Sequence, residues 1–368
     1  MDGLNPSRVR VEADGTAAAL VRHLIDSQQH HDPTDDSTAI TARFDEGKVR
    51  LDDGRVLRPD DTVTAGEFLW FYRRPAPERP VPGELRELHR SPRLLVVDKP
   101  PFMSTLPRGQ HITETAVVRA RRQFGIDTLS PAHRLDRLTR GVLLFTTRQD
   151  VRGAYQRLFE AREVRKTYEA VTEVPEGWLP LLQDAPTSDG ARPLLPVPAG
   201  AFAADSPAGL HPAPTVEEPW VLRHHMVKLR GRMATYLTQD APNAETRVTG
   251  VRLERPAMTP LGTTDTVATP GADAPWRLVW TLEPQSGRTH QLRVNMRLFG
   301  VPIIADPLYG ELSDAALWDV DQRMPLVPAV ADEDFSRPMG LTAVKMMFTD
   351  PFSGELQAFR TSYRADDF

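Results

Sequence analysis

The sequence predicts an α+β protein built on a largely antiparallel or mixed sheet. Apolar or alternating runs typical of strands greatly outnumber helical patterns. In the second half of the chain these runs follow one another directly, without the intervening helices of a doubly wound sheet. The length of 368 residues suffices for one large domain and a smaller one. The chain has no cysteine, which removes disulfides, thiolate-bound metals and thiol nucleophiles.

Clustered prolines divide the chain near its N-terminus. Four of them lie in the charged stretch 73–86 and predict an extended linker over residues 75–89. Residues 1–74 then form a small N-terminal module. A helix is expected in it over Thr16–Ile25, and short strands are expected between Val49 and Trp70.

The larger domain is expected to span residues 90–368. Its strands are predicted at Leu94–Val97, Val142–Phe145, Val164–Thr172, Met226–Leu237, Arg247–Glu254 and Trp276–Glu283. Helical spacing predicts a helix from Thr113, a second one capped by Asp150 and a third over Thr289–Phe299. The proline-rich segments 175–219 and 256–275 lack periodicity and are expected to be loop insertions.

Composition and missing motifs exclude several classes of function. No apolar run of 18 residues exists and no secretory signal is visible, so the sequence predicts a cytoplasmic protein. A net charge of -5 argues against bulk coating of nucleic acid, but it leaves a local basic cleft open. No glycine-rich nucleotide loop and no zinc-protease motif occur, so neither a nucleotide cofactor nor a metal is expected.

The segment His133–Gly141 places one carboxylate, Asp136, among basic side chains. Arg134, Arg137 and Arg140 lie within four residues of it. Nearby positive charge favours the anionic form of an aspartate, which is the form that a nucleophile or a general base needs. The alternative is a surface turn in which Asp136 pairs with an arginine.

Two further segments carry candidate functional side chains. Lys166 and Tyr168 share one face of a predicted strand, where Tyr168 is either an acid or base in a cleft or a packed side chain. Arg288 lies between a strand and a helix, a position from which it can pair with a phosphate or with a catalytic carboxylate. Arg293 and Arg297, four residues apart, share a helix face that suits phosphate contacts or simply faces water.

Together these segments resemble the pseudouridine synthases of the RluA type. The matching pieces occur in the family's order between about residues 90 and 310: Leu95–Pro100, His133–Asp136 with Thr139 and Gly141, Arg165–Tyr168, Ser286–Arg293 and Ile304–Gly310. The resemblance implies a long mixed, mainly antiparallel sheet with flanking helices and a central RNA-binding cleft. It also implies an isomerase that detaches uracil from ribose and reattaches it through carbon 5, without cofactor or metal.

The resemblance gives roles to individual residues. Asp136 is the essential carboxylate, acting on the sugar or assisting glycal formation. Tyr168 stacks beneath the base and assists removal of the carbon-5 proton, and Arg288 pairs with the aspartate. Arg134 occupies the space that the flipped nucleotide leaves. The remaining RNA contacts are expected from His133, Arg137, Lys166, His290, Arg293 and Arg297.

The substrate stays open at this point. The expected partner is structured RNA, either large-subunit rRNA or tRNA, bound by a monomer. Residues 40–72 resemble a degenerate form of the small RNA-binding domain shared with a ribosomal protein. Arg140 stands where the family has a small residue, beside the expected cleft. The alternatives are a non-catalytic ribosome-assembly factor and a glycoside hydrolase, which would need a second carboxylate.

Overall fold

The computed structural model describes residues 2–28, 32–183, 192–255, 275–322, 324–325, 327 and 332–365. The chain divides into two compact units, one made of residues 1–81 and 104–129 and the other of residues 82–103 and 130–368. The first unit thus takes in a helix, α3 (Ala116–Phe124), that the sequence places in the larger domain. Strand β6 (Arg86–Arg90) begins inside the stretch expected to be a linker.

The first unit packs two helices on short strands. Its helices α1 (Ala17–Asp26) and α2 (Ser37–Asp45) enclose an apolar core with the small sheet β1–β5–β3. The Thr16 hydroxyl caps α1 by accepting a hydrogen bond from the Ala19 amide at 3.3 Å. The strands are β1 (Ser7–Arg10), β2 (Gly15–Thr16), β3 (Arg50–Leu51), β4 (Thr62–Val63) and β5 (Phe68–Phe71).

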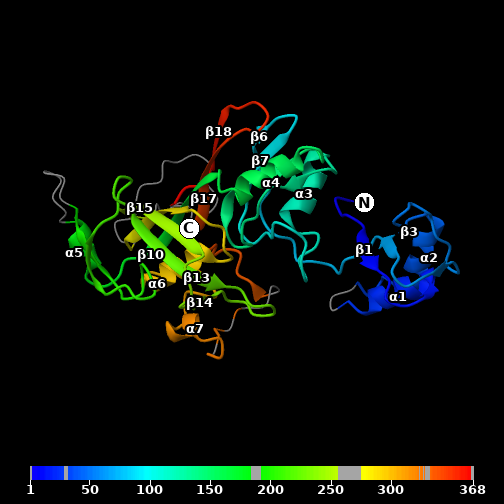
Figure 1. Ribbon diagram of the computed structural model, residues 1–368, viewed down its shortest axis with the longest axis horizontal. Helices are drawn as coiled ribbons and strands as arrows, with labels where there is room; N and C mark the ends of the chain where they lie inside the picture. Colours follow the sequence, from blue (N-terminus) through cyan, green and yellow to red (C-terminus); the bar gives the residue numbers. More distant parts are fainter. Residues whose placement is uncertain are drawn as a thin grey trace. The chain divides into compact units, whose positions relative to one another are not determined.

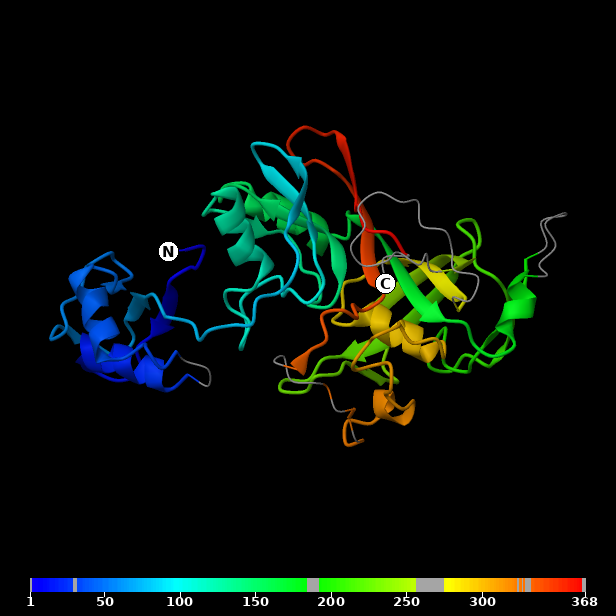
Figure 2. The ribbon, with the colours of Figure 1, turned by 180° about the vertical axis from the view of Figure 1, so that it is seen from behind.

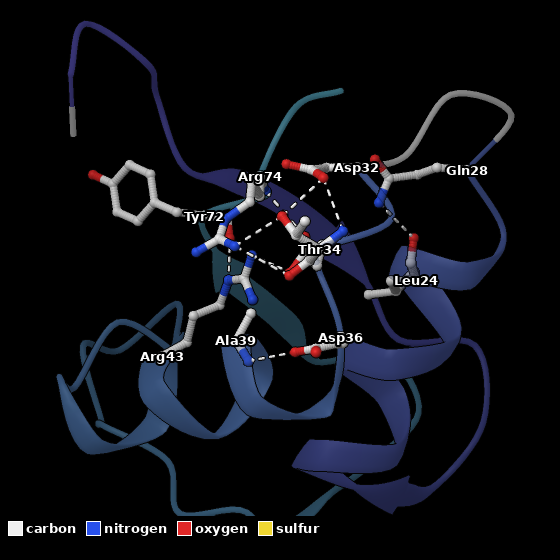
Figure 3. Close-up of polar contacts among 10 residues, drawn as sticks. Leu24, Gln28, Asp32, Thr34, Asp36, Ala39, Arg43, Tyr72 and Arg74 are labelled. Atoms are coloured by element: carbon white, nitrogen blue, oxygen red, sulfur yellow. Dashed lines mark hydrogen bonds and ion pairs between the residues drawn. The ribbon is translucent and has the colours of Figure 1, made fainter. Parts of the chain in front are cut away.

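A buried ion pair holds the end of this small module in place. The Arg43 guanidinium lies 2.6 Å from the Asp35 carboxylate and donates to the Tyr72 carbonyl at 2.6 Å. Arg74 donates to the Thr34 carbonyl at 3.1 Å, next to the same pair (Figure 3). These bonds tie the segment that leaves β5 to the start of α2.

The second unit is built on an eleven-stranded sheet. Nine strands form the path β14–β13–β15–β16–β10–β17–β9–β7–β6, while β18 pairs with β17 and β8 with β9. All pairings in it are antiparallel except the parallel pair β9 and β17, so the predicted α+β class with a mixed, mainly antiparallel sheet is confirmed. Figure 1 and Figure 2 show this sheet from opposite sides; in it β15 pairs with β13 and β16, and β16 pairs with β10.

Except for the segment 226–237, the strands predicted in this unit are present with their bounds shifted by at most three residues, whereas β8, β11, β12, β17 and β18 were not predicted. Its strands are β7 (Leu94–Lys99), β8 (Ser130–Pro131), β9 (Arg140–Thr146), β10 (Arg165–Glu173), β11 (Leu194–Val197), β12 (Gly209–Pro212), β13 (Trp220–Val227), β14 (Tyr236–Thr238), β15 (Ala244–Glu254), β16 (Arg277–Pro284), β17 (Leu341–Thr349) and β18 (Leu356–Arg360). Its helices are α4 (Arg152–Glu160), α5 (Trp178–Gln183), α6 (Gln291–Leu298) and α7 (Ala315–Trp318).

The parallel contact between β9 and β17 depends on a glycine. Gly141 has a φ of 111°, and a Cβ atom there would lie 2.3 Å from the Ala343 carbonyl oxygen. Only glycine allows this close approach of two backbones. Gly141 lies five residues after Asp136. The close contact of the two backbones therefore fixes the place where the turn that carries Asp136 joins β9.

Three expectations differ from the structure. The strand predicted over Met226–Leu237 is a hairpin of β13 and β14, because Gly231 at a φ of 79° turns the chain within a polar run. The segment 175–219 contains α5 and the strand pair β11–β12, anchored where Trp178 packs on Trp280 at 6.3 Å. Helix α4 starts one residue later than a cap at Asp150 requires, and Asp150 pairs with Arg148 instead. The segment 256–274 lies outside the described residues.

Candidate active site

A cleft of about 1150 Å³ in the second unit gathers most of the residues singled out in the sequence. The turn before β9, the end of α4, strand β10 and the segment from β16 into α6 line it. Among the predicted site residues its lining holds His133, Arg134, Asp136, Lys166, Tyr168, Arg288, His290 and Arg293.

Asp136 is held in a turn that is anchored on both sides. The neighbouring side chains of Leu135 and Leu138 are buried, and the Thr139 amide donates to the Asp136 carbonyl at 3.1 Å. The carboxylate itself is half-buried and lines the cleft. Its charge acts on groups from separate elements. It contributes to the raised pKa of Tyr168, and it opposes the lowering of the pKa of His290.

A buried lysine supports the same turn from behind. The ammonium of Lys99, on β7, is fully buried and donates to the carbonyls of Pro100 and Met103 at 2.8 Å each. It also donates to the carbonyl of Arg137, the residue next to Asp136, at 3.2 Å. Burial and the Arg137 charge lower the pKa of Lys99 to about 7, while the Asp136 charge opposes them. The periodicity of the sequence does not predict this contact, because β7 and the turn are far apart in the chain.

Tyr168 lies on β10 between β16 and β17, next to a register shift. Burial raises the pKa of its phenol far above the ordinary value, and the Asp136 charge raises it further. The phenol is therefore protonated throughout the neutral range and can donate a proton or a hydrogen bond. Action as a phenolate base would require the opposite shift of the pKa.

We expect Tyr168 to show no ionisation below about pH 10, the ordinary value for tyrosine, because the folded protein disfavours its phenolate. The measurement is an ultraviolet difference titration of the wild type against Tyr168→Phe. The two curves should coincide up to that pH, and kcat/KM should show no loss on the alkaline side that Tyr168→Phe removes. A phenolate step with a midpoint near pH 8 that belongs to Tyr168 would overturn this interpretation.

Arg293 is the buried arginine next to Asp136. Its guanidinium, on α6, makes two hydrogen bonds to the Asp306 carboxylate, at 2.7 and 2.6 Å, and lies 4.9 Å from the centre of the Tyr309 ring. Burial lowers its pKa, but the charges of Asp306 and Asp136 outweigh burial and raise it above the ordinary value. The sequence predicted Arg293 as an RNA contact and did not pair it with Asp306, which lies in the loop beyond the helix.

Arg288 lines the same cleft as Asp136. Its side chain is exposed, and Nε donates to the Asn243 carbonyl at 3.2 Å. Its backbone amide is held by the Gln291 side chain at 3.0 Å, in the turn before α6. Among the ion pairs of the described residues, none joins Arg288 to Asp136, so the predicted pairing has no counterpart there. A catalytic role for Arg288 stays a prediction.

Two of the arginines predicted to contact RNA lie outside the cleft lining. Arg137 makes a two-bond ion pair with Glu333, at 2.7 and 2.6 Å. Arg297 donates to the Leu312 carbonyl at 2.6 Å and lies 2.9 Å from the Asp314 carboxylate. Both side chains are engaged with protein groups, which leaves less of their charge for a phosphate.

His133 and Lys166 lie together on the other side of the cleft. The Nε2 atom of His133 accepts a hydrogen bond from the Leu144 amide at 3.2 Å, and its ring stacks on Phe159 at 4.6 Å. Burial and the Lys166 charge lower the pKa of His133 to about 3, so this ring is neutral. Burial and the neighbouring Arg162 lower the pKa of Lys166. Arg134 is exposed at the rim.

The described residues contain no candidate membrane span and no candidate metal cluster. None of the helices there is long and apolar enough to cross a membrane. No group of three or more histidine, aspartate or glutamate side chains that could hold a metal ion occurs in the same part of the chain.

A mixed sheet that carries a cleft with several arginine and lysine side chains around Asp136 defines a protein suited to an anionic substrate. The family model described as RNA pseudouridylate synthase matches residues 93–298, more than half of the chain. The chain belongs to this family, which confirms the resemblance noted in its motifs.

Curated relatives show the same similarity. An uncharacterized RNA pseudouridine synthase of Synechocystis sp. is 33% identical over 129 residues, covering 35% of this chain and 44% of that protein. RNA pseudouridine synthase 7 of Arabidopsis thaliana is 25% identical, covering 60% of this chain and 44% of its own length. The chain thus spans less than half the length of these two relatives. tRNA pseudouridine synthase C of Salmonella typhi is 26% identical, covering 74% and 82%.

A solved structure is also similar. Human RNA pseudouridylate synthase domain containing 1 aligns with a TM-score of 0.46 at 19% identity, over 77% of this chain and 86% of that chain.

Proposed function

We propose that this protein converts uridine to pseudouridine in structured RNA, either large-subunit rRNA or tRNA. The observation that carries the proposal is the position of Asp136, whose carboxylate faces the cleft with Tyr168 and Arg293 around it. In this reaction the bond from ribose carbon 1′ to uracil nitrogen 1 breaks and a bond from carbon 1′ to carbon 5 forms. The hydrogen of carbon 5 passes to water as a proton, and nitrogen 1 takes up a proton from water. We place the reaction in a cytoplasmic monomer that uses no cofactor or metal.

The electrostatics of the cleft support this chemistry. The cation of Arg293 interacts with the charge of Asp136, and the reaction at ribose uses a carboxylate in a cleft of this kind. Tyr168 keeps its proton and offers an aromatic ring to an extruded base. Exposed Arg134 stands at the rim, where a guanidinium can stack in the gap that a flipped nucleotide leaves.

A binding-only assembly factor is the competing proposal. Such a protein needs the cations of the cleft but has no use for a carboxylate among them, because an anion repels phosphate. The Asp136 turn, supported by Lys99, therefore favours catalysis over binding alone.

Tritium release from carbon-5-tritiated uridine tests the proposal. We expect the wild-type protein to release tritium from one of two substrates, large-subunit rRNA or bulk tRNA, because a cleft of this kind accepts one class of stem-loop. Mass mapping of the product RNA then locates the modified uridine. Binding of both RNAs without release from either would favour the assembly factor.

A further inference from the structure

His290 occupies a strained position at the floor of the cleft. Its backbone has a φ of 56°, in the left-handed region that non-glycine residues rarely adopt, immediately before α6. Such a conformation is strained and persists where the surroundings impose it. The ring lines the cleft and is half-buried.

Tyr309 fixes the orientation of this ring. Its phenol is fully buried, and the hydroxyl lies 3.0 Å from Nδ1 of His290, with the two rings edge to face. The Thr235 amide donates to the same phenol oxygen at 2.8 Å. The Thr235 hydroxyl gives its own proton to the Thr289 carbonyl at 2.9 Å.

The proton of the phenol can therefore be located. The Thr235 amide reaches the phenol oxygen as a donor. The contacts with Thr235 lower the pKa of Tyr309, but burial outweighs them and raises it to about 12. A buried hydroxyl normally donates its proton as well as accepting one. Within the described residues, the acceptor placed for this proton is Nδ1 of His290, at 3.0 Å. Nδ1 then carries no proton.

His290 is neutral in this setting. Burial and the Arg293 charge lower its pKa to about 4, although Asp136 and Asp306 act in the opposite direction, and Lys228 adds a smaller lowering. A neutral imidazole has one protonated nitrogen. With Nδ1 occupied by the phenol proton, the hydrogen belongs to Nε2.

We propose that Tyr309 is a positioning residue that holds His290 in the Nε2–H form, and that His290 donates this hydrogen bond to an oxygen of the uridine bound in the cleft. The inference rests on the proposed function and deepens it, because it names a donor to the substrate. A neutral donor suits this place. A second cation there would repel Arg293 and would lower the basicity of the Asp136 carboxylate, which weakens it as a nucleophile or base.

A double-mutant cycle with glutamine tests the proposal. The amide nitrogen of glutamine reaches the position of Nε2 and is always a donor, so it needs no tautomer. We expect His290→Ala to lower kcat/KM about 100-fold and His290→Gln to recover most of it. Tyr309→Phe should lower kcat/KM about 10-fold in the wild type and less than about 2-fold in the His290→Gln background. An equal loss in both backgrounds would mean that Tyr309 acts only through packing and Thr235, which overturns the proposal.

The tautomer is read directly by nitrogen-15 NMR of histidine-labelled protein without RNA. We expect His290 to show an unprotonated Nδ1 and a protonated Nε2 at pH 7, and Tyr309→Phe to produce a mixture of the two neutral forms. A protonated Nδ1 in the wild type would refute the proposal. Because this spectrum requires no catalysis, an absence of tritium release from every RNA would count against the proposed function and leave the tautomer as a separate result.

Discussion

Replacement of Asp136 by asparagine should abolish tritium release, with kcat lowered at least about 10⁴-fold. The asparagine amide has nearly the shape of the carboxylate but carries no charge, so the turn anchored by Leu135 and Leu138 should keep its structure. What disappears is the negative charge that acts on Arg293. The rate is measured by single-turnover tritium release with enzyme in excess over the RNA that the wild type modifies.

Binding and stability separate this loss from a defect in folding. RNA affinity of Asp136→Asn should equal that of the wild type or exceed it, because a negative charge is removed from a cation-lined cleft. The matched control is Glu160→Gln, which removes another carboxylate from the cleft lining, at the end of α4. That variant should retain activity within about 5-fold, since its exposed side chain lies among charges screened by water. An active Asp136→Asn enzyme would disprove the proposed function.

Local patterns explain which parts of the fold and site were predictable. The strands β7 and β9 are continuous apolar runs, and Tyr168 lies on an alternating run, so period and burial identify them. Asp136 could be singled out because its basic neighbours are adjacent in sequence. In each case the informative residues lie within about ten positions of one another.

The contacts that complete the site join segments far apart in the chain. Lys99 reaches the carbonyl of Arg137 from β7, and Glu333 pairs with the guanidinium of Arg137 from the segment before β17. Tyr309 orients His290 across nineteen residues. No periodicity encodes such pairings, because they depend on how the sheet brings its loops together. The pairing of Arg293 with Asp306 is another contact of this kind.

Helix α6 carries two ion pairs that differ mainly in burial, and they predict very different stability effects. Arg293 pairs with Asp306, with side chains 5% and 0% exposed. Arg297, one turn later, pairs with Asp314, whose side chain is 82% exposed. Breaking a buried pair leaves an uncompensated charge in a medium that solvates it poorly, whereas a surface charge is solvated by water.

We expect Asp306→Asn to lower the free energy of unfolding by about 3–5 kcal/mol, and Asp314→Asn to lower it by no more than about 1 kcal/mol. Asparagine at position 306 keeps an oxygen that can accept the hydrogen bonds from the Leu308 and Tyr309 amides, at 3.0 and 2.9 Å. It replaces the oxygen that accepts from Arg293 Nε by an NH2 group, so the change removes the charge and one hydrogen bond of the pair. Urea unfolding followed by circular dichroism measures both variants. Equal, small effects would show that Arg293 finds another partner or water when Asp306 is neutral.

The pH dependence of the free energy of unfolding is a second test of the contribution of Asp306. Burial raises the pKa of Asp306, but Arg293 and the amide hydrogen bonds outweigh it and hold the pKa below the ordinary value of 3.8. The Asp306 carboxylate therefore contributes its full stability above the pKa of the unfolded chain, and this contribution is lost as the pH falls through the lower folded value. The wild type should lose stability in acid more steeply than Asp306→Asn, which has no group at this position to protonate. Parallel stability curves for the two proteins between about pH 6 and pH 3 would show that the charge of Asp306 does not stabilise α6 against its loop.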